Sequence, residues 1–114
     1  MTTARITNLT RGTVLASRAL VPETPSERTT GLLNHEELLP GEGLLLLHCS
    51  SIHTFGMKFT IDVCFLDRGL RVLQCMRVNP RKRVMYEGSR CVVELPPGTL
   101  HETRFQDQLK IDFI

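Results

Sequence analysis

Apolar residues along this chain of 114 residues gather in short runs, and turn-forming residues separate the runs. Short apolar runs bounded by Gly, Pro, Asn or Asp are typical of β-strands. Strands are predicted at residues 4–9, 13–21, 43–48, 60–66, 70–78, 91–95 and 109–114. Nearly every position from 61 to 66 is apolar, so we expect this strand to lie in the middle of the sheet with both faces covered.

One segment carries the pattern of a helix start. Residues 24–27 read Thr-Pro-Ser-Glu, which places a threonine N-cap, a proline at the first helical position and a glutamate three residues after the cap. We expect this helix to reach about Leu33 and to end at Asn34, with a short turn at 35–38. The predicted fold is therefore α+β: a mainly antiparallel, curled or barrel-like sheet with one or two short helices packed against it. The length predicts a single domain over residues 1–114.

Composition leaves this picture largely unchanged. Hydrophobic residues make up 41% and charged residues 23% of the chain, and a formal net charge of +2 does not call for a nucleic-acid or membrane partner. The first residues lack the apolar segment of a signal peptide, so we expect a cytoplasmic protein. No Cys-x-x-Cys pattern occurs, and we expect reduced thiols rather than disulfides at Cys49, Cys64, Cys75 and Cys91.

Asp62 is the sharpest candidate site residue, because it stands between Ile61 and Val63 in the predicted central strand. A carboxylate that loses its hydration there needs a partner. The expected partner is one of three basic side chains, Arg28, His53 or Lys58. Asp62 then acts either as a general base or ligand anchor, or as half of a structural ion pair between helix and sheet. The structural interpretation is favoured.

His53 begins a turn that continues Thr-Phe-Gly-Met, and Gly56 in that turn permits close backbone approach. His53 is either an acid–base group or a side chain that holds the turn through backbone hydrogen bonds. His48, Cys49 and His53 do not have the spacing of a zinc site, so no metal and no cofactor are predicted.

Glu94 repeats the situation of Asp62 inside a second apolar run, residues 92–95. If strands 60–66 and 91–95 come together, Asp62 and Glu94 line one cavity near His53, an arrangement that suits hydrolysis in principle. The alternative is that Glu94 faces solvent at the end of its strand.

Positive charge concentrates between residues 77 and 90. Such a segment can contact a phosphate or a nucleic-acid backbone. Tyr86 is the only aromatic residue within it, so a solvated basic loop is favoured and no nucleic-acid partner is expected. The basic residues are Arg77, Arg81, Lys82, Arg83 and Arg90.

Three sequence elements together resemble an uncharacterised family of small prokaryotic proteins, domain of unknown function 192. They are Arg-Thr-Thr-Gly-Leu-Leu at 28–33, His-Thr-Phe-Gly-Met-Lys-Phe-Thr-Ile-Asp-Val at 53–63 with Phe65, and Val-Glu-Leu at 93–95 with Pro-Gly at 97–98. The resemblance spans about residues 28–113. It implies a compact, mainly β architecture with a short helix, and it brings no established activity.

The chain departs from the family pattern in three places. Leu33 replaces the usual methionine, and Gly56 stands where another branch of the family has tryptophan. Many members have Gly-Asp near the C-terminus, whereas this chain has Gln106-Asp107. Because glutamine lacks the freedom of glycine at positive φ, a left-handed turn is not expected at Gln106.

Taken together, these features predict a non-enzymatic domain that binds a small polar or anionic ligand, or a protein partner, in a cleft near His53 and Asp62. The predicted cleft residues are Arg28, His53, Thr54, Phe55, Met57, Asp62 and Glu94. One alternative is a cofactor-free hydrolase or isomerase that uses His53 with Asp62 or Glu94. Another is a nucleic-acid accessory protein that uses the basic segment 77–90. We expect a monomer or a small homo-oligomer without a membrane partner.

Overall fold

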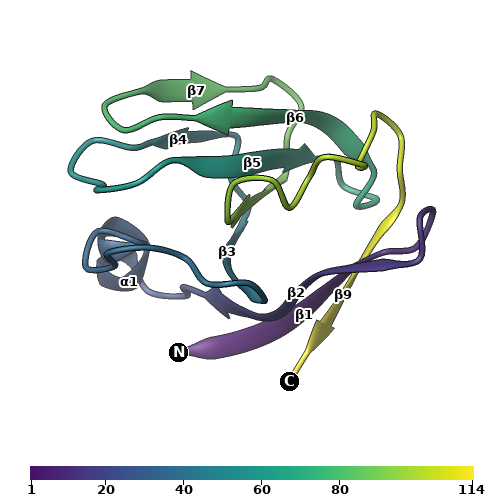
Figure 1. Ribbon diagram of the computed structural model, residues 1–114, viewed down its shortest axis with the longest axis horizontal. Helices are drawn as coiled ribbons and strands as arrows, with labels where there is room; N and C mark the ends of the chain where they lie inside the picture. The colour runs from purple at the N-terminus through teal and green to yellow at the C-terminus, as the bar shows by residue number, and fades with distance from the viewer.

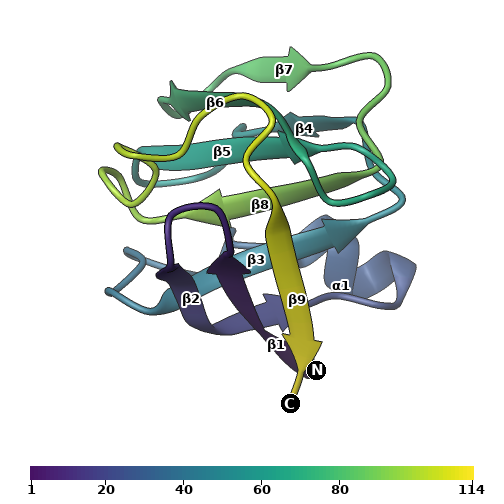
Figure 2. The same ribbon diagram turned by 90° about the vertical axis from the view of Figure 1, so that its right-hand side faces the viewer.

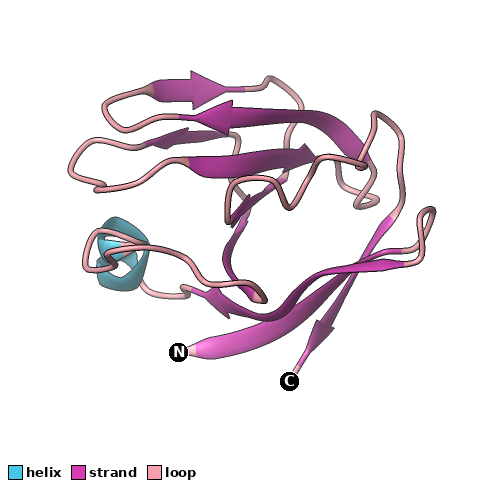
Figure 3. Ribbon diagram, viewed as in Figure 1, coloured by secondary structure: helices cyan, strands magenta, loops and turns pink.

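A curled β-sheet forms the body of the protein, and one short helix lies beside it (Figures 1 and 3). The computed structural model describes all residues from 1 to 114. Its elements are β1 (Thr2–Asn8), β2 (Thr13–Val21), α1 (Pro25–Thr30), β3 (Glu42–Leu47), β4 (Ser51–His53), β5 (Ile61–Leu66), β6 (Val72–Val78), β7 (Arg83–Met85), β8 (Cys91–Leu95) and β9 (Leu109–Phe113). The prediction of a mainly β fold with a curled sheet is confirmed.

Seven strands form the main sheet in the order β6-β5-β8-β3-β2-β1-β9, and β4 pairs with β7 in a separate two-stranded ribbon. All neighbouring strands are antiparallel except β2 and β3. The sheet curls until its two edge strands meet at one end, where Arg71 bridges to Gln108 and the Leu109 N–H donates to the Leu70 carbonyl oxygen at 2.9 Å. Figure 2 shows β9 descending past β1 from the loop that reaches β6. The result is a half-barrel.

The capping box predicted at the helix start is confirmed. The Glu27 N–H donates to Thr24 Oγ1 at 3.1 Å, and the Thr24 N–H donates to Glu27 Oε1 at 3.3 Å. The predicted end at Leu33 is wrong, because α1 stops at Thr30 and Gly31 takes a φ of +45° that breaks the helix. Residues 35–38 form no helical turn, so the structure has one helix. With six residues in α1, no helix is long and apolar enough to cross a membrane.

The sheet separates two apolar clusters. Inside the curl, side chains from all seven strands of the main sheet form the first cluster. On the outer face of β3, β8 and β5 lies the second, which the segment after α1 and the β4–β7 ribbon cover. All six residues of β5 are buried, with Val63 and Phe65 in the outer cluster and Cys64 and Leu66 in the inner one. The expectation that both faces of this strand are covered is confirmed, but β5 lies next to the edge strand β6 rather than in the middle of the sheet.

Asp62 is buried and paired, but its partners differ from those predicted. The residue is 6% exposed, and its carboxylate accepts hydrogen bonds from Arg77 Nε at 3.2 Å and from the backbone N–H groups of Gly98 and Leu100 at 2.8 and 3.2 Å. Arg77 is the residue directly opposite Asp62 on β6. Asp62 therefore ties β5 to β6 and to the loop after β8.

The three predicted partners of Asp62 have other contacts. Arg28 donates to the Leu47 carbonyl oxygen at 3.0 Å, and Lys58 forms a salt bridge with Glu36 at 2.6 Å. His53 is exposed on β4. The prediction that Asp62 pairs with the helix is therefore wrong. Its charged partner is Arg77, which the antiparallel register places directly opposite it on β6.

Asp107 holds the turn that leads into β9. The residue is 3% exposed, and its carboxylate accepts hydrogen bonds from Arg11 Nε at 2.9 Å, Asn8 Nδ2 at 3.0 Å and the Arg104 N–H at 2.9 Å. Gln106 takes a φ of +70°, so the left-handed turn is present although glycine is absent, and the expectation from the sequence is wrong there. The Asp107 contacts with Arg104 in the preceding loop and with Asn8 and Arg11 of the β1–β2 hairpin stabilise this conformation.

We predict that Asp62→Ala lowers the free energy of unfolding by about 2–4 kcal/mol, because it leaves two backbone N–H groups without an acceptor in a buried loop. Urea denaturation measures this loss. The matched control is Asp112→Ala, which removes a partly exposed carboxylate of β9 that faces Lys110, with an expected change below about 0.5 kcal/mol. Equal changes in the two variants would contradict the structural role of Asp62.

A second prediction concerns acid stability. The hydrogen bonds from Arg11 lower the pKa of Asp107 from 3.8 to about 2. Asp107 therefore contributes stability that is present above its unfolded pKa and is lost as the pH falls through about 2. The difference in unfolding free energy between the wild type and Asp107→Asn should be largest near neutral pH and shrink across this acid range. A difference that stays constant with pH would contradict this account.

Candidate functional site

A cavity of about 160 Å³ lies between α1 with the loop after it, β3, β4 and β8. A cavity of similar size accommodates a molecule of about six non-hydrogen atoms. Half of its lining residues are hydrophobic, and polar groups from three segments reach the same space. The polar lining residues used below are Arg28, Thr30, Cys49, His53 and Glu94.

Strand register places Glu94 at this cavity. Glu94 lies directly opposite Leu44 of β3 on one side and Val63 of β5 on the other. Residues directly opposite each other share one face of a sheet. Glu94 therefore points to the outer face, among the apolar side chains of the second cluster.

The same register separates the two buried carboxyl groups. Asp62 lies opposite Leu95, one position further along β8, and Leu95 belongs to the inner cluster. Because successive residues of a strand point to opposite faces, Asp62 and Glu94 lie on opposite sides of the sheet. The prediction that they line one cavity is wrong, as is the alternative that Glu94 faces solvent.

Glu94 is the buried carboxyl group that the protein itself does not pair. It is 5% exposed, and its side chain takes part in no salt bridge of the structure. Burial alone raises the pKa of Glu94 to about 7. Near neutral pH the group is therefore present both as an acid that can donate a hydrogen bond and as a carboxylate that can accept one.

Arg28 supplies the positive charge of the cavity. It stands in the last turn of α1, is half-buried, and donates through Nη1 to the Leu47 carbonyl oxygen at 3.0 Å. That contact ties α1 to the end of β3 and restricts the guanidinium to the wall of the cavity. A guanidinium has five N–H donors, so donors remain beyond the one that Leu47 occupies.

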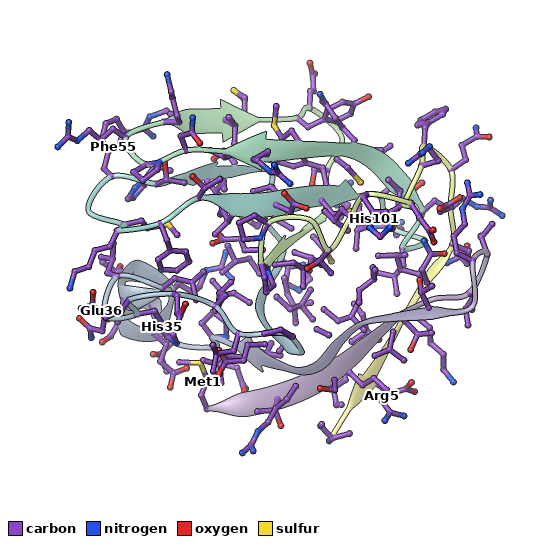
Figure 4. All side chains as sticks on the ribbon, in the orientation of Figure 1. Met1, Arg5, His35, Glu36, Phe55 and His101 are labelled. Atoms are coloured by element: carbon purple, nitrogen blue, oxygen red, sulfur yellow. The ribbon has the colours of Figure 1, made fainter.

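His53 lines the cavity from β4, where it lies opposite Arg83 of β7. Its ring packs at 5.8 Å from that of Phe55, with a 40° angle between the planes. Phe55 itself is 48% exposed at the periphery of the molecule and does not line the cavity (Figure 4), so its predicted place among the cleft residues is wrong. Met57 is buried and does line it.

Thr54 stabilises the turn rather than the cavity. Its hydroxyl donates to the Asn79 carbonyl oxygen at 2.7 Å and accepts from the Lys82 N–H at 2.9 Å. These bonds join the turn after β4 to the turn between β6 and β7. Nearby, Gly56 takes a φ of +85°, a conformation that favours glycine, and a Cβ there would also lie 3.2 Å from Leu33 Cδ2.

The basic residues of segment 77–90 do not reach the cavity. Arg77 pairs with Asp62, while the others are exposed at the β6–β7 turn, at the start of β7 and just before β8. A role in phosphate or nucleic-acid binding stays a prediction.

Several lining residues were not predicted from the sequence. Thr30 follows Arg28 on α1, and Cys49 donates its thiol to the Ser51 carbonyl oxygen at 3.1 Å. Leu44 and Leu46 form part of the apolar wall, on the opposite face of β3 from Leu45. An uninterrupted run of leucines gives no indication of which face each one takes, so the wall could not be identified from the run.

Comparisons with known proteins agree with this architecture. A UPF0127 protein of Thermococcus sibiricus is 33% identical over 101 residues, which is 82% of this chain and 64% of the relative. The chain thus spans about two-thirds of that relative's length. A crystal structure of a protein of unknown function from Novosphingobium aromaticivorans has a TM-score of 0.77 at 18% identity, with 95% of this chain and 83% of that one covered.

A second solved structure, from Sinorhizobium meliloti, also has a TM-score of 0.77, at 15% identity over 98% of this chain and 92% of that one. At such low identity the two structures show a shared fold. The family model for DUF192, described as "Uncharacterized ACR", matches residues 6–113. Because this match extends over nearly the whole chain and agrees with the curved, mainly β architecture, the chain belongs to the DUF192 family.

Proposed function

We propose that the cavity binds a small organic carboxylate that also carries a hydroxyl or amino group. The observation that carries this proposal is Glu94, a buried carboxyl group without a partner in the protein, in a cavity that also presents Arg28. A buried carboxyl group without a hydrogen-bond partner lowers stability, and a ligand in the cavity that Glu94 lines can supply that partner. The predicted site thus keeps Arg28, His53, Met57 and Glu94, while Asp62 belongs to the framework.

The presence of Arg28 in the cavity favours a ligand that carries an anionic group. A guanidinium matches a carboxylate through two parallel hydrogen bonds, and its orientation is already restricted by the bond to Leu47. The restricted side chain loses less entropy when the ligand binds.

The presence of Glu94 favours a second polar group, a hydroxyl or an amine, on the same ligand. With a pKa raised to about 7 by burial, it either accepts a hydrogen bond from an amine or a hydroxyl, or donates one to an oxygen. The apolar walls contributed by Leu44, Leu46, Ile52 and Met57 then contact the carbon skeleton. A volume of about 160 Å³ restricts this skeleton to a few carbon atoms.

For the alternative of a cofactor-free hydrolase or isomerase, only one of the two proposed residue pairs lines a common cavity. His53 and Glu94 line the same cavity, whereas Asp62 lies on the other face of the sheet. A carboxyl group that titrates near neutral pH suits general acid–base catalysis. Turnover of a bound carboxylate that is lost in both His53→Ala and Glu94→Gln would favour this alternative.

A cytoplasmic location is part of the proposal. All four cysteines are free thiols, including two whose sulfur atoms lie 3.7 Å apart. Reducing compartments maintain thiols in this form.

We predict that small hydroxy- and amino-carboxylates bind this cavity and that their amides do not. The probes are lactate, 2-hydroxybutanoate and alanine, with lactamide as the neutral counterpart, and binding is followed by chemical-shift changes of backbone amides around the cavity. Arg28→Ala should weaken binding of the carboxylates by about tenfold or more, because a charge-assisted pair is lost. The control Arg90→Ala removes an exposed arginine outside the cavity and should leave binding unchanged. Equal binding of lactate and lactamide would contradict the role of Arg28.

A further prediction tests the burial of Glu94 in the ligand-free protein, through the pH dependence of its stability. Because its pKa rises from 4.5 in the unfolded chain to about 7 in the fold, Glu94 lowers stability as the pH rises between these values. The full loss is about 3 kcal/mol. Glu94→Gln should therefore be more stable than the wild type at about pH 8 and similar to it at about pH 5, as measured by urea denaturation. An unchanged pH dependence in this variant would contradict an unpaired, buried Glu94.

A further inference from the structure

Two cysteines face each other on adjacent strands, away from the cavity. Cys64 of β5 and Cys75 of β6 are directly opposite in the antiparallel register, and their sulfur atoms lie 3.7 Å apart. Cys64 is completely buried, whereas Cys75 is partly exposed on the edge strand of the sheet.

We propose that Cys64 and Cys75 form a peroxide-sensitive modification site, in which Cys75 is oxidised first and Cys64 then closes a disulfide with it. The proposal does not depend on the carboxylate site, because neither cysteine lines the cavity.

The strand geometry already suits a disulfide. Directly opposed residues in antiparallel strands have Cα atoms about 4.5 or 5.5 Å apart, depending on their place in the hydrogen-bond ladder. Both spacings fall within the range of roughly 4.4–6.8 Å that disulfides require. The bond can therefore form by rotation of the two side chains, without movement of β5 relative to β6.

Access distinguishes the two thiols. Cys75 lines a shallow surface groove of about 260 Å³ together with Arg77 and His101, and Cys64 does not line it. A small oxidant reaches Cys75 through this groove. Figure 4 shows His101 beside β5, on the loop that borders the groove.

The electrostatics also favour Cys75 as the first thiol to react. The hydrogen bond between the two sulfur atoms lowers the pKa of Cys75 and raises the pKa of Cys64 well above its ordinary value. Since the thiolate is the nucleophile, Cys75 attacks the oxidant and Cys64 remains protonated. Asp107 and Asp62 act in the opposite direction on the pKa of Cys75, but the hydrogen bond from Cys64 is the largest contribution and the net shift is downward.

The chemistry balances with hydrogen peroxide as the oxidant. The Cys75 thiolate attacks one peroxide oxygen, the O–O bond breaks, and the leaving hydroxide takes a proton to become water, which leaves a sulfenic acid on Cys75. The Cys64 sulfur then attacks the Cys75 sulfur. The S–S bond forms, the S–O bond breaks, and the hydroxyl leaves as water with the proton from Cys64. Two thiols and one peroxide give one disulfide and two waters.

Cleavage sites in the sequence make the product easy to identify. Trypsin cuts after Lys58, Arg68, Arg71 and Arg77, so Cys64 and Cys75 fall on separate peptides, residues 59–68 and 72–77. After treatment of the full-length reduced protein with hydrogen peroxide and alkylation of the remaining thiols, mass spectrometry should find these two peptides joined. A reducing agent should separate them.

Single variants test the order of the two steps. In Cys64→Ser, Cys75 should accumulate as a sulfenic acid that dimedone traps, whereas in Cys75→Ser the buried Cys64 should stay unmodified. Cys49 is the internal comparison, because it is also partly exposed and its thiol donates to a backbone oxygen rather than to another thiol. Cys75 should be oxidised about tenfold faster than Cys49.

Two results would overturn the proposal. One is oxidation of Cys75 at the rate of Cys49 or below. The other is a disulfide that joins Cys75 to a cysteine other than Cys64, or no joined peptide at all, in protein whose circular dichroism spectrum remains that of the reduced form. Either result would leave the carboxylate-binding proposal intact, because its test uses the reduced protein and different residues.

Discussion

The register of β8 between β3 and β5 is the constraint on which the rest of the structure depends. It sets Glu94 opposite Leu44 and Val63 and sets Leu95 opposite Asp62. A slip of one residue would exchange the faces of every side chain on the strand. Glu94 would then enter the inner cluster, where Leu95 now packs among apolar side chains from all seven strands of the main sheet. The apolar surfaces on both faces therefore specify the register, and the register in turn decides where each acidic group lies.

Once the register is set, the surroundings give two buried acidic groups different roles. Asp62 finds an arginine on the adjacent strand and two backbone N–H groups in the loop after β8, so its hydrogen-bonding capacity is taken up within the fold. Glu94 has only apolar residues opposite it on both neighbouring strands, and it lines the cavity. The difference between a paired and an unpaired carboxyl group therefore follows from what lies opposite each one. Arg28 completes the contrast, since its bond to Leu47 holds a cation at the same cavity.

Local patterns in the sequence were sufficient for the parts of the fold that depend on local contacts. The capping box predicted the start of α1 because Thr24 and Glu27 satisfy each other's backbone within one turn. The partner of Asp62 was not predictable in this way, because Arg77 reaches it through a hairpin whose register shifts between Phe65 and Leu66. The short strands β4 and β7 were missed for a related reason: three residues give too little periodicity, and the ribbon is recognisable only from its pairing. Glu94 was identified as a candidate from its apolar neighbours, but the side of the sheet on which it lies required the pairing of three strands.

The central claim is that Glu94 is a buried acid which the protein leaves for a ligand to complete. The most direct measurement is a pH titration of its side-chain carboxyl carbon by NMR in the ligand-free protein, assigned by comparison with Glu94→Gln. We expect burial to hold the pKa of Glu94 at about 7. The other glutamates of the chain serve as the internal reference in the same titration. Titration of Glu94 at its ordinary value of 4.5 would show that water or an unrecognised cation already solvates the group, and would contradict the account.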